Sequence, residues 1–306
     1  MWRDEARAWV RDLFPTSRIF TFEAHRDRVW GSIWKLGVDD GLYWFKRGHP
    51  VLWREVRLRR LLTRLAPDHV LPVVADDPDR GWMLTADQGP TLAARARQEG
   101  AHHYVELAAA LGQVQRTLGH HPDLQGIGLA SFAPADAVGR LDDMLARFDA
   151  LPTGHPAHIS PAQRTSAVKA MATVVQRWEA VGTGLPDLGL DHNDLHAGNA
   201  FPGPLISDWG DAVLGHPFCS LRPLLHAATT VFGPGPGRAV RRAYLAQWGE
   251  PDELDEALEV AMLLAVPQRL HCWQALRSEE AMAEFAGYIV PLWEEVGRPV
   301  GRLTQP

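Results

Sequence analysis

Apolar residues in the first part of the chain follow two patterns, helical spacing and short β-type runs. Together these patterns predict a small lobe that contains both helices and strands. Spacings of three and four predict helices over residues 2–13 and from Pro50 through Leu65. Turn sequences at 25–27, 39–41 and 76–81 separate runs of β-type residues. The strands expected from these runs are Arg18–Ala24, Val29–Leu36, Leu42–Lys46, Val70–Ala75 and Trp82–Thr85. This part of the chain therefore predicts a five-stranded antiparallel sheet with a helix inserted after the third strand.

The spacing of apolar residues changes at the polar sequence 86–90, and beyond it helical periodicity dominates. Helices are expected around 104–118, 138–148, 161–178, 219–230, 238–248, 252–277 and 279–297. We expect Pro267 to bend or split one of them, and the sequence at 233–237 (GPGPG) to be an irregular connector. The predicted fold class is α+β with two lobes. Residues 1–86 form an N-terminal lobe, 87–90 a hinge, and 91–306 a larger, mainly helical lobe.

Composition places the chain among globular proteins. Its 306 residues are 46% hydrophobic and 22% charged. Only Cys219 and Cys272 are present, which argues against a disulfide framework and suits a reducing compartment. We find no signal-peptide pattern at the N-terminus and no apolar stretch of the roughly 20 residues that a membrane span needs. We therefore expect a soluble, cytoplasmic protein that does not insert into a membrane.

Charge is unevenly distributed between the two predicted lobes. The net charge is −6, of which residues 1–86 contribute +3 and the remainder −9. This balance suits an anionic ligand in the first lobe and a cationic one in the second, or simply two solvated surfaces. Because no basic run is interleaved with aromatic residues, nucleic-acid binding is not expected.

Lysine is rare in this chain, so its position carries information. Of the 31 Lys and Arg residues, only Lys35, Lys46 and Lys169 are lysines. An ammonium group at the end of a strand can contact phosphate oxygens as a point charge, and taken alone Lys46 fits an exposed strand-end cation equally well. Glu55, early in the next helix, is placed to pair with it. Gly31 and Ser32 offer backbone N–H groups to a phosphate, or are ordinary strand residues.

The strongest chemical pattern lies between residues 191 and 210. Asp194 and Asn199 occur in the sequence DHNDLHAGN, and Asp208 follows a short apolar run closed by Pro202–Pro204. A carboxylate in such a loop can orient a hydroxyl group and accept its proton. An amide and a second carboxylate supply the hard oxygen ligands that magnesium prefers. His192 and His196 raise the alternative of a zinc or two-metal hydrolase, but Gly198 argues against the helix that would align them.

The order of these residues resembles the aminoglycoside phosphotransferase and choline kinase-like family of small-molecule kinases. The sequence HNDLHAGN at 192–199 is similar to that family's HGDLHPGN, and ISDWGDA at 206–212 is similar to its metal-binding segment. Asn193 replaces the family's usual glycine, a position where asparagine tolerates unusual backbone angles. His216 and Ser220 stand where the family usually has supporting acids. The intervals from Asn199 to Asp208 and from Lys46 to Glu55 are short for the family.

The resemblance implies a kinase fold with ATP or GTP as phosphate donor and magnesium as cofactor. It implies that Asp194 is the catalytic base, that Asn199 and Asp208 ligate the metal, and that Lys46 contacts phosphate. The purine would bond to the backbone around Thr85, Ala86 and Asp87.

The acceptor is expected to be a hydroxyl group of a small molecule, foremost an aminoglycoside-like antibiotic or amino sugar. A metabolite kinase acting on choline, a sugar or homoserine shares the same residues, and a nucleotide-binding regulator without transfer activity is a further alternative. An acidic run at 250–256 suits a cationic acceptor, but it also suits the N-terminus of a helix.

Overall fold

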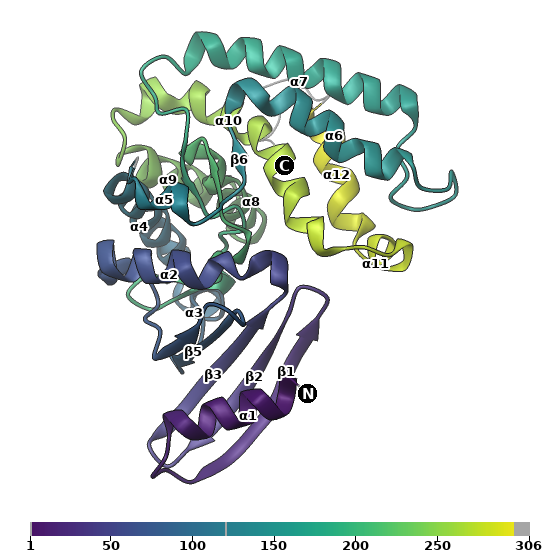
Figure 1. Ribbon diagram of the computed structural model, residues 1–306. Helices are drawn as coiled ribbons and strands as arrows, with labels where there is room; N and C mark the ends of the chain where they lie inside the picture. Colours follow the sequence, from purple (N-terminus) through teal and green to yellow (C-terminus); the bar gives the residue numbers. More distant parts are fainter. Residues whose placement is uncertain (1, 120, 297–306) are drawn as a thin grey trace.

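The computed structural model describes residues 2–119 and 121–296, and within them the N-terminal part folds around an antiparallel sheet (Figure 1). The sheet has the order β1-β2-β3-β5-β4. Its strands are β1 (Ile19–Arg28), β2 (Gly31–Val38), β3 (Gly41–Gly48), β4 (Ala75–Asp77) and β5 (Trp82–Ala86). Helix α2 (Arg54–Leu65) follows β3 after a 3₁₀ turn at Pro50–Leu52. The expected five-stranded antiparallel sheet with an inserted helix is confirmed.

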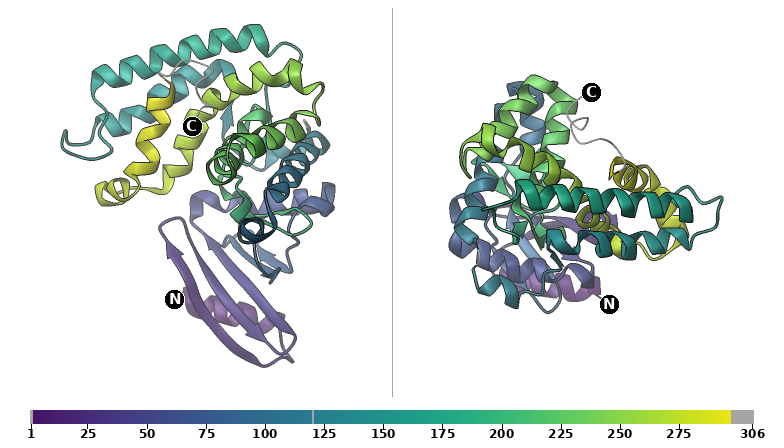
Figure 2. Two further views of the ribbon diagram at one scale, coloured as in Figure 1. Left: turned by 180° about the vertical axis from the view of Figure 1, so that it is seen from behind. Right: turned by 90° about the horizontal axis from the view of Figure 1, so that it is seen from above.

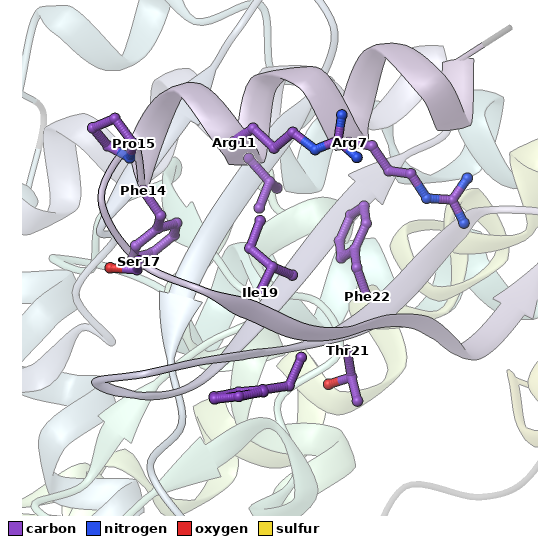
Figure 3. Close-up of a pocket in the computed structure, with 10 residues that line it drawn as sticks. Arg7, Arg11, Phe14, Pro15, Ser17, Ile19, Thr21 and Phe22 are labelled. Carbon is purple, nitrogen blue, oxygen red and sulfur yellow. The ribbon is translucent and has the colours of Figure 1, made fainter.

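Helix α1 (Trp2–Leu13) covers one face of this sheet, as Figure 1 shows. Its buried Ala6 and Val10 join Trp34, Phe45 and Trp82 in a core separate from that of the helical lobe. A hollow lies between the helix and β1, where Ile19 and Phe22 point toward α1 (Figure 3). No residue proposed for chemistry lines this hollow, so we interpret α1 and its core as a scaffold for the sheet.

Two strand predictions in this lobe were wrong. Strand β1 does not end at a turn over 25–27 but continues to Arg28, because a bulge between Ala24 and Arg26 absorbs the irregular residues without breaking the pairing. The strand expected at Val70–Ala75 begins only at Ala75. Val70 instead bridges to Ile206 of the helical lobe, so its apolar side chain is buried away from the sheet.

The second lobe consists mainly of helices (Figures 1 and 2). They are α3 (Leu92–Glu99), α4 (His102–Leu118), α5 (Asp123–Gly126), α6 (Ala137–Asp149), α7 (Pro161–Val181), α8 (Leu221–Phe232), α9 (Pro234–Leu245), α10 (Pro251–His271), α11 (Glu279–Glu284) and α12 (Ala286–Val296). Ser160 caps α7 with a capping box, which satisfies backbone donors in its first turn. The predicted α+β fold with a larger helical lobe is confirmed. Within the described residues, no helix is long and apolar enough to cross a membrane.

Three predictions about helix boundaries in this lobe need correction. The sequence GPGPG at 233–237 is not an irregular connector, because α9 begins at Pro234. The N–H groups in the first turn of a helix have no acceptor within the helix. Proline, which lacks an N–H group, is therefore tolerated there. Pro267 does not split α10, which runs continuously to His271 and gives way to a 3₁₀ turn at Cys272–Ala275. The stretch expected at 279–297 divides near Phe285, and its last residue lies outside the described residues.

Two small β structures hold the loop that carries the chemistry. Strand β10 (Val213–Gly215) lies between β6 (Ser131–Phe132) and β7 (Gly189–Asp191) in a three-stranded sheet. Strands β8 (Ala200–Phe201) and β9 (Leu205–Ile206) form the short hairpin expected after Asn199. Its turn contains Gly203 at φ +95°, a conformation that favours glycine. Because β7 ends where the loop begins, the packed sheet fixes the start of the loop.

Candidate active site

The loop after β7 is held in an unusual conformation at Asn193. This residue has φ 63° in the left-handed region, as its asparagine side chain led us to expect. Its Nδ2 donates to the carbonyl oxygens of Asp211 (3.2 Å) and Gln268 (2.8 Å) and lies 3.2 Å from Sγ of Cys272. The side chain therefore ties the loop to the segment after β9 and to α10, and it turns the next residue, Asp194, into the cleft.

A buried polar network supports the same loop from behind. Ser220 Oγ accepts from the backbone N–H of His192 (2.9 Å) and donates to Asp191 Oδ1 (2.5 Å). Gln115 Nε2 donates to Ser220 Oγ and to the carbonyls of Leu190 and Pro217. Burial raises the pKa of Asp191 to about 7. The hydroxyl group at 220 and the carboxyl group at 191 thus provide the support for which the family usually uses acids.

Asp194 points into a cleft between the lobes and forms an ion pair there. Arg269, in the last turn of α10, places Nη2 2.9 Å from Asp194 Oδ1. Its Nη1 donates to the carbonyl oxygen of Asn193. Only 15% of the Arg269 side chain is exposed, and burial lowers its pKa, but the negative charges of Asp194 and Asp211 oppose this effect and the pKa is raised. Arg269 thus fixes one oxygen of the Asp194 carboxylate through this ion pair.

The β8–β9 hairpin brings Asn199 and Asp208 to the same end of the loop. Ser207 donates through its backbone N–H (2.8 Å) and its hydroxyl group (2.9 Å) to the carbonyl oxygen of Asn199. Asn199 Nδ2 donates to the carbonyl oxygen of Asp194 (3.1 Å), which leaves its Oδ1 as the remaining oxygen. Asp208 has φ 59° and lies beside Ser207. One amide and one carboxylate oxygen at this position fit the ligands of a magnesium ion.

Lys46 connects the sheet to this metal-ligand end of the loop. Its Nζ lies 2.7 Å from Glu55 Oε2 and 2.5 Å from Asp208 Oδ1, so the predicted Lys46–Glu55 ion pair is present. Burial raises the pKa of Asp208, but the charge of Lys46 prevails and lowers it to about 2. A Cβ atom at Gly210 would lie 3.2 Å from Glu55 Oε2, so glycine there lets α2 approach closely.

The remaining predicted site residues lie in the sheet. Gly31 opens β2 opposite Gly48, and a Cβ atom there would lie 2.7 Å from the Arg47 carbonyl oxygen, so strand packing alone requires glycine. Gly31 and Ser32 nevertheless line the cleft that contains Asp194. Thr85–Asp87 lie at the end of β5, outside that cleft lining, where the Asp87 N–H donates to the Leu42 carbonyl oxygen (2.9 Å).

The two histidines of the loop are committed to its own backbone. His192 is fully buried, its Nδ1 accepts from the Asp194 N–H, and its Nε2 contacts the Ser207 carbonyl oxygen. His196 Nδ1 accepts from the Gly198 N–H (3.0 Å). Among the described residues, the one group of three or more His, Cys, Asp or Glu side chains that could hold a metal is Glu99, His102 and His103, and it includes no residue of this loop. The zinc-hydrolase alternative therefore gains no support from the geometry.

Several residues at the site were not anticipated from the sequence. Arg269 lines the cleft but lies 75 positions after Asp194, and no motif marks it. Asp211 also lines it; burial and the charge of Asp194 raise its pKa to about 7. Ser220 was noted only as a departure from the family pattern. The acids of DWGD were a usable signal, since two carboxylates in so short a segment mark a polar site.

The two lobes and the cleft between them define the class of fold: a two-lobed, protein-kinase-like fold of the kind found in small-molecule kinases. No protein-family model matches the sequence, and no curated protein sequence matches it. Solved structures do match along almost the whole chain, which confirms the resemblance drawn from the loop at the level of the fold.

Three of these structures illustrate the likeness. Wild-type aminoglycoside 2′-phosphotransferase-IIIa in its GDP complex matches with a TM-score of 0.63 at 16% identity, covering 96% of this chain and 97% of that chain. Choline kinase LicA from Streptococcus pneumoniae matches with a TM-score of 0.64 at 13% identity, with the same coverage. A thermostable mutant of the aminoglycoside phosphotransferase APH(4)-Ia, in a ternary complex with ADP and hygromycin B, matches with a TM-score of 0.60 at 12% identity, covering 95% and 97%.

Proposed function

We propose that this protein transfers a phosphoryl group from a nucleoside triphosphate to a hydroxyl group of a small molecule. The observation that carries the proposal is the arrangement across the cleft. Lys46 of the sheet contacts Asp208, and the hairpin joins Asp208 to Asn199 and Asp194. A cation and hard oxygens for the donor phosphates thus lie next to a carboxylate suited to a hydroxyl group.

In the proposed reaction each residue has one task. The acceptor oxygen attacks the γ-phosphorus, the bond from that phosphorus to the β–γ bridging oxygen breaks, and the hydroxyl proton passes to Asp194. The products are a phosphate monoester and a nucleoside diphosphate. Arg269 holds Asp194 in position through its ion pair. Asn199 and Asp208 would hold a magnesium ion, which when bound would neutralise charge on the phosphates.

The donor would bind against the sheet. Residues 1–86 would form the nucleotide-binding lobe, with 87–90 as a hinge to the lobe at 91–306. Lys46, held by Glu55, would contact phosphate, and Gly31 and Ser32 would lie over it. The backbone at Thr85, Ala86 and Asp87 would meet the purine of ATP or GTP. Matching structures described as GDP and ADP complexes support a purine nucleotide.

The acceptor would be a small hydroxyl compound, and two classes remain in view. The sequence favoured an aminoglycoside or amino sugar, and a matching structure that contains hygromycin B supports this acceptor class. An enzyme that phosphorylates such an antibiotic would confer resistance to it. A metabolite kinase is the second candidate, and the positively charged side chains that line the cleft favour it. The protein would act in the reducing cytoplasm, in keeping with two free cysteines, on neither nucleic acid nor membrane.

Acceptor-dependent release of ADP or GDP tests the proposal. Purified protein with Mg²⁺ and nucleotide is given a panel of hydroxyl compounds, and product is followed with a coupled assay. The proposal predicts release that depends on one class of acceptor and is lost in Asp194→Asn. Nucleotide binding without turnover on any acceptor would instead favour a regulatory protein.

A further inference from the structure

The cleft beside Asp194 offers little to a cationic acceptor. Two of its three carboxylates are already engaged: Asp194 pairs with Arg269, and Asp208 pairs with Lys46. Arg26 and Arg28 add two more cations to its wall. A polyamine bound here would face arginines, and Asp211 would be the one carboxylate of the cleft lining without an ion pair of its own.

The acidic run that suited an amino sugar lies far from this cleft. It occupies the start of α10, whereas Arg269 lies in the last turn of that helix. The helix has 21 residues, and at 1.5 Å per residue it is about 30 Å long. Three of these acids also pair with arginines: Asp252 with Arg242, Asp255 with Arg241, and Glu256 with Arg177. The run therefore serves the helix and its neighbours rather than the acceptor.

Arg54 lies outside the lining of this cleft, but it is a cation with two unpartnered nitrogen atoms. Its Nε and Nη2 atoms are buried and find no hydrogen-bond partner among the described residues. It is the first residue of α2, where the helix dipole disfavours positive charge. Helix α2 packs against the turn at Trp209–Asp211, and the guanidinium interacts electrostatically with Asp211, which lines the cleft. Such a residue costs stability unless a ligand uses it.

At the end of α10, two further buried nitrogen atoms have no hydrogen-bond partner in the part of the chain that the structure describes. Nε1 of Trp273, which lines the cleft, and Nε2 of His271 are both buried without a partner among the described residues. Arg54 and Arg140 both act electrostatically on His271. The Arg140 guanidinium lies over Phe132, whose ring contacts His271 at 5.3 Å. Arg54 and Arg140 thus both direct positive charge at His271, and Trp273, two residues further on, lines the cleft.

The aromatic residues nearby do not form a cage for a quaternary ammonium group. Phe285 and Tyr288 both stack on Trp273, with ring centroids 5.3 and 6.1 Å away. Trp30, at the β1–β2 turn, contacts Phe285 and Trp273 edge-on. Binding of a cation requires several open ring faces around one point. Trp273 and Phe285 stack on each other, and Tyr288, although 69% exposed, does not line the cleft.

We propose that the acceptor carries an anionic group, a carboxylate or a phosphate, which binds to Arg54 with Trp273 and His271 while its hydroxyl group meets Asp194. The inference rests on the proposed kinase function and names its acceptor class. The oxygen atoms of a phosphate or carboxylate group would accept hydrogen bonds from these unpartnered donors. The negative charge of the group would offset the charge of the desolvated guanidinium. The preferred substrates are hydroxy acids and sugar phosphates rather than amino sugars.

The first test asks whether Arg54 serves stability or binding. Arg54→Met removes the unpartnered donors and keeps the length of the side chain. Without added anion, we expect its melting temperature to equal or exceed that of the wild type. The exposed Arg57 of the same helix, replaced in Arg57→Met, is the matched control. A melting temperature for Arg54→Met clearly below both proteins would mark Arg54 as a structural residue and overturn the proposal.

The second test measures anion binding directly, with sulfate as the probe. ADP and Mg²⁺ are added first to saturation, and their effect on the melting temperature establishes nucleotide binding. If that effect is absent, the proposed function itself fails. Sulfate is then titrated at constant ionic strength. We expect saturable stabilisation of the wild type and of Arg57→Met, at least tenfold weaker sulfate binding in Arg54→Met, and an intermediate value in Arg54→Lys. Equal binding in all four proteins overturns the inference.

Turnover separates the acceptor class from the function. Glucose 6-phosphate, glucuronate, glucose and glucosamine share a skeleton but differ in charge, and kanamycin serves as a polycation. The inference predicts that kcat/KM is highest for an anionic member and that Arg54→Met raises its KM at least tenfold. Faster turnover of glucosamine or kanamycin would overturn the inference and leave the kinase function standing.

Discussion

Lys46 and Asp208 contact each other at 2.5 Å although 162 positions separate them. Lys46 comes from the third strand of the sheet, and Asp208 follows the hairpin of the helical lobe. Glu55, 2% exposed, holds the same ammonium group from α2. Burial lowers the pKa of Lys46, but the charges of Asp208 and Glu55 more than compensate and raise it. The ammonium group is therefore a fixed positive charge at the point where the lobes meet.

This pair predicts that lysine, and not merely a cation, is required at position 46. A planar guanidinium is too broad to share the space between Glu55 and Asp208. We expect both Lys46→Met and Lys46→Arg to lower kcat/KM for the nucleotide about 100-fold or more. Lys35→Met, at the site of another lysine in the sheet, should remain within about twofold of the wild type. Steady-state kinetics with varied nucleotide provides the measurement, and an active Lys46→Arg protein would contradict the assigned contact.

Arg269 is a positioning residue, because it acts on the reaction through Asp194. Its loss would free the carboxylate and leave the Asn193 carbonyl oxygen without its donor. We expect Arg269→Gln to reduce kcat by about tenfold or more while KM for the nucleotide changes little. Arg269→Lys should restore part of kcat. Equal losses in kcat and in nucleotide affinity, with no rescue by lysine, would indicate a general structural defect instead.

Asn193 combines a strained backbone with three side-chain contacts, and two substitutions separate these effects. Asn193→Gly keeps φ 63° accessible but loses the contacts to Asp211, Gln268 and Cys272, at a cost of about 1–3 kcal/mol. Asn193→Ala loses the same contacts and adds about 1 kcal/mol of backbone strain. Urea denaturation should therefore rank the alanine variant below the glycine variant. The reverse order would show that backbone conformation does not matter at this position.

Asp191 gives the stability of the protein a specific dependence on pH. Its pKa is raised to about 7 by burial, so between about pH 4 and pH 7 the folded state binds a proton that the unfolded state releases. Its contribution to stability is present in full at low pH and is lost as pH rises toward 7. Asp191→Asn has no such proton to lose. The stability of this variant relative to wild type should therefore rise between about pH 4 and pH 7, by at most about 1.4 kcal/mol per pH unit.

Urea denaturation of both proteins at several pH values measures this difference. Histidines with lowered pKa values, such as His192 and His216, are shared by both proteins and cancel. Asp187→Asn, which replaces an exposed acid in the same way, corrects for the loss of a carboxyl group. A difference between Asp191→Asn and wild type that does not change with pH would show that Asp191 is ionised in the folded protein.

The sequence was most informative where one segment contains its own chemistry. The loop from Asp191 to Gly210 could be interpreted because Asp194, Asn199 and Asp208 lie close together in the chain and the hairpin between them is short. The strands and the helix near Lys46 followed from periodicity for the same local reason. Contacts that depend on the folded chain could not be predicted. Arg269 reaches Asp194 only because α10 ends beside the loop.

The failures have equally specific physical causes. The prolines and glycines of 233–237 indicate a connector when considered alone, yet the first turn of α9 tolerates them. Val70 has the composition of a strand residue, but its partner is Ile206 in the other lobe. Ser220 stands where the family usually has an acid, which indicated weaker support for the loop. Only the fold shows that Ser220 hydrogen-bonds to Asp191, which supplies a carboxyl group there.

The central claim is transfer of phosphate to a hydroxyl group with Asp194 as the base. Phosphorus NMR of a reaction with ATP, Mg²⁺ and the best acceptor measures the product directly. The account predicts a new phosphate monoester signal that grows with the ADP signals. In Asp194→Asn we expect the rate to fall by about 100-fold or more while the affinity for ADP is unchanged. Asp187→Asn should match the wild type. A monoester formed equally fast by Asp194→Asn, or ATP consumed only to inorganic phosphate, would contradict it.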